Sequence, residues 1–356
     1  MHGGDIYRNK IQLDFSVSIN PLGMSESIRR VVSENMQVLE QYPDQKCEKL
    51  KLALADKLKI SASQILFGNG ASELIPAVLR ALKVRRALMF APCFVGYKRA
   101  FLSLIEAAES PVEFSFFNLS WQTQFKLNDK LLEELDNCLE LKRPDIFIVT
   151  NPNNPDGSVK PLPQMEVLAK LCRKHGTKLL IDECFMELSD NAKTDTFVPL
   201  LAEYPEVMVL RAFTKTFAVP GLRLGYLLSA DERLLEKVEM QLAEWNVSSI
   251  AQCAGLAALQ DEAYLERARN LIKQERLFLC DELKKLGFKV FGSSGNFLLF
   301  YSEETRLKEK LIEKGILIRD CSDYEGLKKG FYRISIKKHA ENQKLIECIQ
   351  EVCEAK

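Results

Sequence analysis

The chain has 356 residues, 47% of them hydrophobic and 28% charged, and its 49 basic residues balance 49 acidic ones. A formal net charge of zero disfavours a general nucleic-acid-binding protein, and no apolar run approaches the roughly 20 residues of a membrane-spanning helix. The ten cysteines are scattered without a CxxC pair, which disfavours disulfides, and the three histidines are too far apart in the sequence to suggest a zinc site. The N-terminal segment carries charges where a signal peptide would be apolar. We therefore expect a cytoplasmic protein that acts on small molecules.

Short apolar runs that alternate with helical patterns predict an α/β fold with a mostly parallel sheet, covered by helices on both faces. Strands are predicted at residues 65–67, 87–90, 145–150, 178–181, 207–211 and 225–228, and helices at 73–82 and 164–175. From residue 230 the pattern changes to long charged helices, followed by strands at 297–301 and 332–336 and helices at about 303–314 and 339–353. We therefore expect a large domain at residues 26–230, and a smaller α+β domain formed by residues 1–25 and 231–356 with an interdomain helix.

Ligands of a parallel sheet bind beyond the carboxyl ends of its strands, so the residues that follow each predicted strand are the first candidates for a site. The segment GNGAS (68–72) follows the first strand and opens a helix, whose N-terminal amides either bind a phosphate or form an ordinary turn. The segment NPNNPDG (151–157) follows the strand at 145–150, and its two prolines hold the asparagine side chains in fixed directions.

Two charged residues also follow predicted strands. Asp182 comes directly after the strand at 178–181, where a carboxylate is a helix cap, one half of a salt bridge or part of a polar site. Lys215 lies four residues past the strand at 207–211, and PGLRLG (220–225) brings Arg223 eight residues later. Because a single lysine is most often a solvated surface residue, the combined order of these segments carries more weight than any one of them.

The chain resembles the pyridoxal-phosphate enzymes of the class I and II aminotransferase family over nearly its whole length. The resemblance lies in the order of six features: GNGAS, PCF (92–94), NPNNPDG, Asp182, Lys215 and PGLRLG. The resemblance implies a fold-type I architecture with a mostly parallel seven-stranded sheet, pyridoxal 5′-phosphate as cofactor, and a homodimer. It implies that Lys215 bonds covalently to the cofactor aldehyde and moves protons, and that Asp182 lies against the ring nitrogen. Further cofactor contacts are implied for Gly70, Ala71, Ser72, Phe94, Asn154, Thr214 and Arg223, and for Tyr42, which in relatives reaches the phosphate of the neighbouring subunit.

Two positions depart from the family pattern. Phe185 stands where most relatives have a tyrosine that donates to the cofactor's phenolate oxygen, which leaves Asn154 as the side chain expected to bond that oxygen. Ala212 stands where relatives often have serine or threonine near the phosphate. Neither change removes an indispensable element of the site.

Two arginines in the C-terminal part are candidate substrate ligands. Arg333, in FYRIS (331–335), matches the arginine that binds the substrate carboxylate in this family, and Arg319 ends another apolar run. Each of them could instead form a surface ion pair, which would contribute little to stability. Two arginines suit a substrate with two anionic groups, such as an amino acid that also carries a phosphate.

The ends of the chain narrow the resemblance to one branch of the family. Both ends resemble the branch of L-threonine-O-3-phosphate decarboxylases and histidinol-phosphate aminotransferases. The segments that carry this resemblance are HGGDIY (2–7), DFS and INPLG (14–23), and RDC and YEGL (319–327). This branch adds Asn20 and His2 as candidate substrate ligands, although HGG could also be a flexible terminus. Ser18 stands where the decarboxylases commonly have asparagine.

The branch implies decarboxylation of L-threonine O-3-phosphate to (R)-1-amino-2-propanol O-2-phosphate and CO2, in cobalamin biosynthesis. The alternative is a histidinol-phosphate-type aminotransferase that passes an amino group to 2-oxoglutarate, because both reactions use the same catalytic residues. Transcription regulators with this fold carry a DNA-binding segment ahead of the aminotransferase pattern, which here starts by Asp14. We therefore expect an enzyme, with no nucleic-acid or membrane partner.

Overall fold

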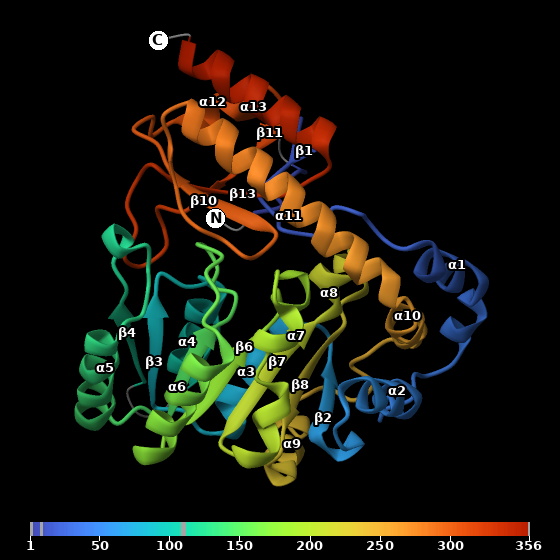
Figure 1. Ribbon diagram of the computed structural model, residues 1–356. Coiled ribbons are helices and arrows are strands. Elements are labelled where there is room, and N and C mark those ends of the chain that lie inside the picture. The colour runs from blue at the N-terminus through green and yellow to red at the C-terminus, as the bar shows by residue number, and fades with distance from the viewer. Residues whose placement is uncertain (1–2, 8–9, 108–111, 355–356) are drawn as a thin grey trace.

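The computed structural model describes residues 3–7, 10–107 and 112–354, and its helices and strands form two units stacked on one another (Figure 1). The large unit consists of a seven-stranded sheet and the helices packed on it. The small unit contains a four-stranded sheet, a separate pair of short strands and the C-terminal helices.

The sheet of the large unit is mostly parallel and has the strand order β2-β8-β7-β6-β5-β3-β4, as expected for an α/β fold. Strand β8 pairs antiparallel with β2 and β7, and the remaining pairs are parallel. The sequence pattern does not predict β4, because this edge strand is exposed at both ends and half-buried between them. The strands are β2 (Ile65–Gly68), β3 (Arg86–Ala91), β4 (Glu113–Asn118), β5 (Ile146–Thr150), β6 (Lys178–Asp182), β7 (Val207–Ala212) and β8 (Gly225–Ser229).

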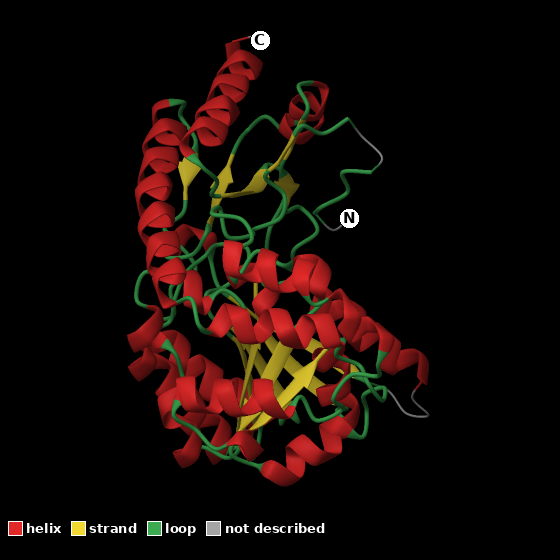
Figure 2. Ribbon diagram, turned by 90° about the vertical axis from the view of Figure 1, so that its right-hand side faces the viewer, coloured by secondary structure: helices red, strands yellow, loops and turns green. Residues whose placement is uncertain are grey.

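Both faces of this sheet are covered by helices, which explains why its central strands are almost continuously apolar (Figure 2). Successive strand residues face opposite sides, so Phe147 and Val149 of β5 enter one apolar core and Ile146 and Ile148 enter the other. The first core is completed by α2 (Glu48–Leu58), α5 (Asp129–Lys142), α6 (Leu162–Lys174) and α10 (Ser249–Leu259). The second is completed by α3 (Ala71–Ala81), α4 (Gly96–Ala107) and α9 (Glu232–Glu239).

The small unit contains strands from both ends of the chain. The N-terminal β1 (Leu13–Asp14) pairs in parallel with β11 (Ile316–Leu317), which ties the first residues to this unit. The antiparallel sheet has the order β12-β13-β10-β9, with β9 (Lys289–Val290), β10 (Phe297–Tyr301), β12 (Arg319–Asp320) and β13 (Phe331–Ser335). A third apolar core joins it to α11 (Glu262–Lys285), α12 (Leu307–Glu313) and α13 (His339–Glu354).

Two helices that follow residue 230, α9 and α10, pack on elements of the large unit. Leu234, Leu235 and Val238 of α9 belong to the same core as α3 and β8, and α10 packs against α1 (Glu26–Glu34) and α2. The long helix α11 then runs from the large unit to the small one (Figure 1). An amphipathic pattern identifies an apolar face but not the unit against which that face packs, so the division of the chain at residue 230 stays a prediction.

Shorter elements complete the fold. Helices α7 (Ala192–Asp195) and α8 (Phe213–Thr216) follow β6 and β7, and 3-10 helices lie at Met36–Glu40, Ala62–Gln64, Trp121–Thr123, Met186–Leu188, Val198–Glu203 and Pro220–Leu222. Within the described ranges, no helix is both long enough and apolar enough to cross a membrane. No disulfide joins the cysteines of the described residues.

Candidate active site

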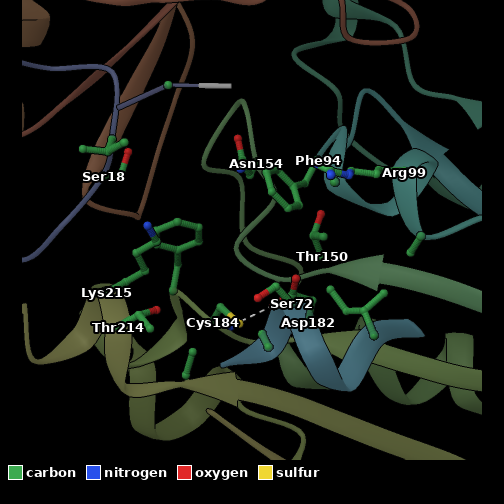
Figure 3. Close-up of a pocket in the computed structure, with 18 of the residues that line it drawn as sticks. Ser18, Ser72, Phe94, Arg99, Thr150, Asn154, Asp182, Cys184, Thr214 and Lys215 are labelled. Atoms are coloured by element: carbon green, nitrogen blue, oxygen red, sulfur yellow. Dashed lines mark hydrogen bonds between the residues drawn. The ribbon is translucent and has the colours of Figure 1, made fainter. Parts of the chain in front are cut away.

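A cavity of about 600 Å3 opens where the carboxyl ends of β5, β6 and β7 meet the small unit. The large unit contributes Thr150, Asp182 and Lys215 to its wall, while Arg319 and Arg333 come from the small unit. Figure 3 shows Lys215, Asn154, Phe94 and Asp182 around one central space. Residues predicted from separate segments of the sequence therefore converge in one place.

One end of the cavity forms an anion cradle, by which we mean the N-terminus of α3 with Ser72, Thr214 and Arg223. Arg223 Nη2 donates to Ser72 Oγ at 2.8 Å, and Nη1 donates to the carbonyl of Pro220 at 3.1 Å. Gly70, with φ of 79°, precedes the helix, and a Cβ at this position would lie 2.7 Å from Arg223 Nη2. Free helix amides, two hydroxyls and a guanidinium in this arrangement can hold a phosphate.

Lys215 lies in α8, directly after β7, and its half-buried amine faces the cavity (Figure 3). Burial, and then the positive charge of Arg333, lower the pKa of Lys215 to about 8. An ordinary lysine holds its proton far more tightly, with a pKa near 10.4. Roughly a tenth of Lys215 is therefore a neutral nucleophile at pH 7, a far larger fraction than for an ordinary lysine.

Asp182 ends β6 and its carboxylate receives two hydrogen bonds. Tyr97 Oη donates to Oδ2 at 2.8 Å, and the backbone amide of Cys184 donates to Oδ1 at 3.0 Å. Tyr97 is fully buried, and burial raises its pKa well above the usual value, so its hydroxyl remains a donor. The two donors hold the carboxylate of Asp182 in one orientation.

Tyr97 was not identified by the sequence analysis, although it lies close to a segment that was. It occupies the first turn of α4, three residues after Phe94, and the motif PCF drew attention to the ring of Phe94 instead. Phe94 lines the cavity as expected, with its ring edge-on to that of Tyr97 at 6.3 Å between centroids. The hydrogen bond of Tyr97 reaches a carboxylate 85 positions away, which no local pattern indicates.

Asn154 joins the two units through its amide oxygen. Arg333 Nη1 donates to Asn154 Oδ1 at 2.5 Å, and Tyr324 Oη donates to the same oxygen at 3.3 Å. Arg333 Nη2 is bound by the carbonyl of Ser16 at 2.7 Å, whereas its buried Nε has no hydrogen-bond partner among the described residues. The two donors to its oxygen leave Asn154 Nδ2 as the group that can donate into the cavity.

Arg319 and Arg333 lie directly opposite one another on β12 and β13. Both are buried and both line the cavity. Asp323 accepts from Arg319 Nη2 at 2.8 Å with each carboxylate oxygen, and this ion pair offsets part of the charge. Like charges opposite each other destabilise a strand pair, so an anionic ligand between the two guanidiniums would be favourable.

The remaining predicted substrate ligands have different positions. Asn20 is buried, but its Nδ2 donates to the carbonyl of Thr216 and its Oδ1 accepts from the amide of Leu22, and it does not line the cavity. It instead braces the segment next to Lys215. Ser18 lines the cavity with a buried hydroxyl that has no partner in the part of the chain described. His2 lies outside the described residues.

Tyr42 lies outside the cavity of its own chain. Tyr42 is 80% exposed, and its ring packs at a tilt of 33° against that of Trp245, with 4.6 Å between the ring centroids. Phe185, the first departure from the family pattern, lines the cavity and packs edge-on against Phe297. Ala212, the second departure, also lines the cavity at the end of β7.

A buried ion pair next to the site was also missed by the sequence analysis. Arg211 donates to Glu183 Oε2 through Nε at 3.0 Å and through Nη2 at 2.7 Å. Thr196 donates to the same oxygen at 2.8 Å, and the amide of Phe197 donates to Oε1 at 2.7 Å. This network joins the ends of β6 and β7, from which Asp182 and Lys215 project. Breaking such a buried pair on one side costs about 3–5 kcal/mol.

A sequence profile described as aminotransferase class I and II matches residues 10–349. The chain is 35% identical to a threonine-phosphate decarboxylase of Salmonella typhimurium over 96% of this chain and 91% of that protein. It is 31% identical to a histidinol-phosphate aminotransferase of Clostridium novyi, with the same two coverages. The crystal structure of the histidinol-phosphate aminotransferase from Clostridium acetobutylicum has a TM-score of 0.87 at 28% identity, covering 97% of this chain and 100% of that one.

Proposed function

We propose that this chain, which belongs to the class I and II aminotransferase family, decarboxylates L-threonine O-3-phosphate to (R)-1-amino-2-propanol O-2-phosphate and CO2. It is a pyridoxal 5′-phosphate enzyme, and we assign the reaction to cobalamin biosynthesis. The substrate assignment rests on two buried arginines, Arg319 and Arg333, which lie opposite one another in the cavity wall. They fit an amino acid with a carboxylate and a second anionic group.

The anion cradle fits the phosphate of this cofactor. A phosphate dianion requires several donors, and the N-terminal amides of α3, the hydroxyls of Ser72 and Thr214 and the guanidinium of Arg223 supply them. The absence of a side chain at Gly70 leaves the space in front of Arg223, which a Cβ would fill. We infer that these groups hold the cofactor by its phosphate.

Three further side chains fit the other polar atoms of the cofactor. The neutral amine of Lys215 suits its aldehyde, the carboxylate of Asp182 suits a protonated ring nitrogen, and Asn154 Nδ2 suits the phenolic oxygen. Bound pyridoxal phosphate supplies an electron sink for the electron pair of a bond broken at the substrate Cα.

Residues of this chain would then decide which bond at Cα breaks. With its carboxylate at Arg333 and its phosphate at Arg319, the substrate is held at both ends and adopts one orientation. The hydroxyl of Ser18, which has no partner among the described residues, supplies one more donor to this site. As the carboxylate leaves as CO2, Lys215 Nζ can deliver a proton to Cα, so that hydrogen replaces the carboxylate in the product.

Release of CO2 tests this function. Purified protein loaded with cofactor should release CO2 from L-threonine O-3-phosphate without any added 2-oxo acid, and much more slowly from L-threonine. Arg319→Leu should reduce this preference by about 10-fold or more, because a charged hydrogen bond of about 1.5–3 kcal/mol is lost. A strict requirement for 2-oxoglutarate would exclude the decarboxylase.

The second candidate is a histidinol-phosphate-type aminotransferase. It is favoured by the similarity to such enzymes at 31% and 28% identity. An aminotransferase would also need the two arginines, but it would break the Cα–H bond and pass the amino group to 2-oxoglutarate. Formation of glutamate from 2-oxoglutarate, without CO2, distinguishes the two reactions in the same assay.

The lowered pKa of Lys215 should make the rate of cofactor uptake depend on pH. Because the pKa of Lys215 is lowered to about 8, the rate at which apoprotein attaches pyridoxal phosphate should rise with pH up to that value and level off above it. Arg333→Met removes a repelling positive charge, so it should move this midpoint to higher pH. Stopped-flow absorbance measures both midpoints. A wild-type midpoint near the ordinary lysine value of about 10.4 would contradict the assigned environment.

We also propose that the enzyme is a homodimer with shared active sites. Arg223 and Ser72 lie on the exposed side of the anion cradle, and Tyr42 projects into solvent from its own chain. A second copy that covered the cradle would bring its Tyr42 hydroxyl to the cofactor phosphate. Sedimentation of the enzyme at the mass of a single chain would exclude this arrangement.

A further inference from the structure

The segment between β12 and β13 carries a tyrosine that contacts both ends of the cavity. Tyr324 is 3% exposed and lines the cavity. Two backbone bonds fix its position: its amide donates to the carbonyl of Cys321 at 3.1 Å, and its carbonyl accepts from the amide of Leu327 at 3.1 Å. The side chain is therefore held in place by a turn on either side.

The hydroxyl of Tyr324 acts on the amide of Asn154. The oxygen Oδ1 can only accept, so Tyr324 must be the donor in their 3.3 Å contact. Burial raises the pKa of Tyr324, which keeps this hydroxyl protonated. Arg333 donates to the same oxygen from a different direction. A flipped amide would place NH2 against both donors, so the two contacts together hold Nδ2 on the cofactor side.

The ring of Tyr324 acts on Arg319. The guanidinium carbon lies 5.2 Å from the ring centroid, within the range of a cation–π contact. Asp323, the preceding residue, binds Nη2 of the same guanidinium at 2.8 Å. The guanidinium is thus held by a ring and by a carboxylate while it lines the cavity.

From these contacts we infer that Tyr324 is a positioning residue with two separable tasks: its hydroxyl sets the orientation of Asn154 toward the cofactor, and its ring sets the orientation of Arg319 toward the second anionic group of the substrate. The first task compensates for Phe185, which lines the same cavity without a hydroxyl. The second task rests on the proposed function, because it concerns the substrate phosphate.

Two substitutions separate the tasks. Tyr324→Phe removes the hydroxyl and keeps the ring, whereas Tyr324→Leu removes both. Tyr332→Phe is the matched control: Tyr332 is also buried, and its hydroxyl donates to the carbonyl of Glu304 at 3.1 Å, away from the cavity lining. All three proteins should be loaded with cofactor and their melting temperatures compared first.

The first measurement is the pH titration of the visible absorbance of the holoenzyme. The deprotonated holoenzyme carries negative charge on the cofactor's phenolic oxygen, which a well-oriented Asn154 Nδ2 stabilises. Tyr324→Phe and Tyr324→Leu should therefore raise the titration midpoint by about 0.5–1 pH unit, the equivalent of one weakened hydrogen bond. Tyr332→Phe should leave the midpoint unchanged. An unchanged midpoint in Tyr324→Phe would overturn the assignment to the hydroxyl.

The second measurement is the ratio of the dissociation constants for L-threonine and L-threonine O-3-phosphate, taken from spectral titration. Tyr324→Leu should reduce the preference for the phosphorylated acid by about 3- to 10-fold, as expected for loss of a cation–π contact, and Tyr324→Phe should retain it. Equal preference in the Leu and Phe variants would overturn the role of the ring. A wild-type protein without the preference would overturn the proposed function and this second task, while the pH titration still decides the first.

Discussion

Lys215→Ala should abolish covalent attachment of the cofactor and reduce turnover by at least about 1,000-fold, because it removes both the nucleophile and the group that moves protons at Cα. The amine is suited to both tasks, since burial and the charge of Arg333 lower its pKa to about 8. Mass spectrometry after borohydride reduction should find the cofactor on residue 215 in the wild type and on no lysine in the variant.

A second buried lysine provides the control for this substitution. Lys160 is 5% exposed, and burial lowers its pKa as well, but it lies behind the NPNNPDG segment with its amine 5.1 Å from the ring of Phe90. Lys160→Met should destabilise that segment and still retain the covalent cofactor. If Lys215→Ala kept a reducible attachment or normal turnover, the assignment of Lys215 would be wrong.

Asp182→Asn should lower turnover by about 1,000-fold while changing cofactor affinity by less than about 10-fold, because the amide keeps the shape of the carboxylate but loses its charge. The anion cradle is formed by other side chains and is unaffected by this change. Turnover and the cofactor dissociation constant should be measured on the same preparation. An equal loss of affinity and turnover would indicate that Asp182 acts chiefly in binding.

Tyr97→Phe is the matched control for the charge of Asp182. It removes one of the two donors, the hydroxyl at 2.8 Å, and leaves the carboxylate and the amide of Cys184 in place. Loss of one hydrogen bond to a charged group, about 1.5–3 kcal/mol, corresponds to a decrease of roughly 10- to 100-fold. The variant should therefore lie between the wild type and Asp182→Asn. A Tyr97→Phe enzyme as slow as Asp182→Asn would show that orientation matters more than charge.

The residues predicted most directly from the sequence are those next to a buried strand. Asp182 is the last residue of β6 and Lys215 lies three residues after the end of β7, and the apolar strands themselves mark the edge of the sheet where these side chains must emerge. The same reasoning placed NPNNPDG at the end of β5 and GNGAS at the end of β2. Their roles came from the family resemblance, and the structure adds the contacts that suit each residue to its proposed role.

Several parts of the fold and site were not predictable in this way. The edge strand β4 lacks the continuous apolar run of its neighbours, because one side of it has no partner strand. Asn20 belongs to a recognisable segment, yet its amide is occupied by the backbone around Lys215. The motif predicted that Asn20 is close to the site, but whether its polar atoms are available depends on packing.

The sequence alone determined the α/β class, the position of most strands and helices, and the family with its cofactor, because periodicity and the residues that follow a strand are local properties of the chain. The tertiary structure decided which distant groups act on one another. Tyr97 and Asp182 are 85 positions apart, Tyr324 and Asn154 are 170 apart, and Arg333 and Ser16 are 317 apart. Such contacts depend on how the two units pack, and neither hydrophobic period nor motif spacing encodes them.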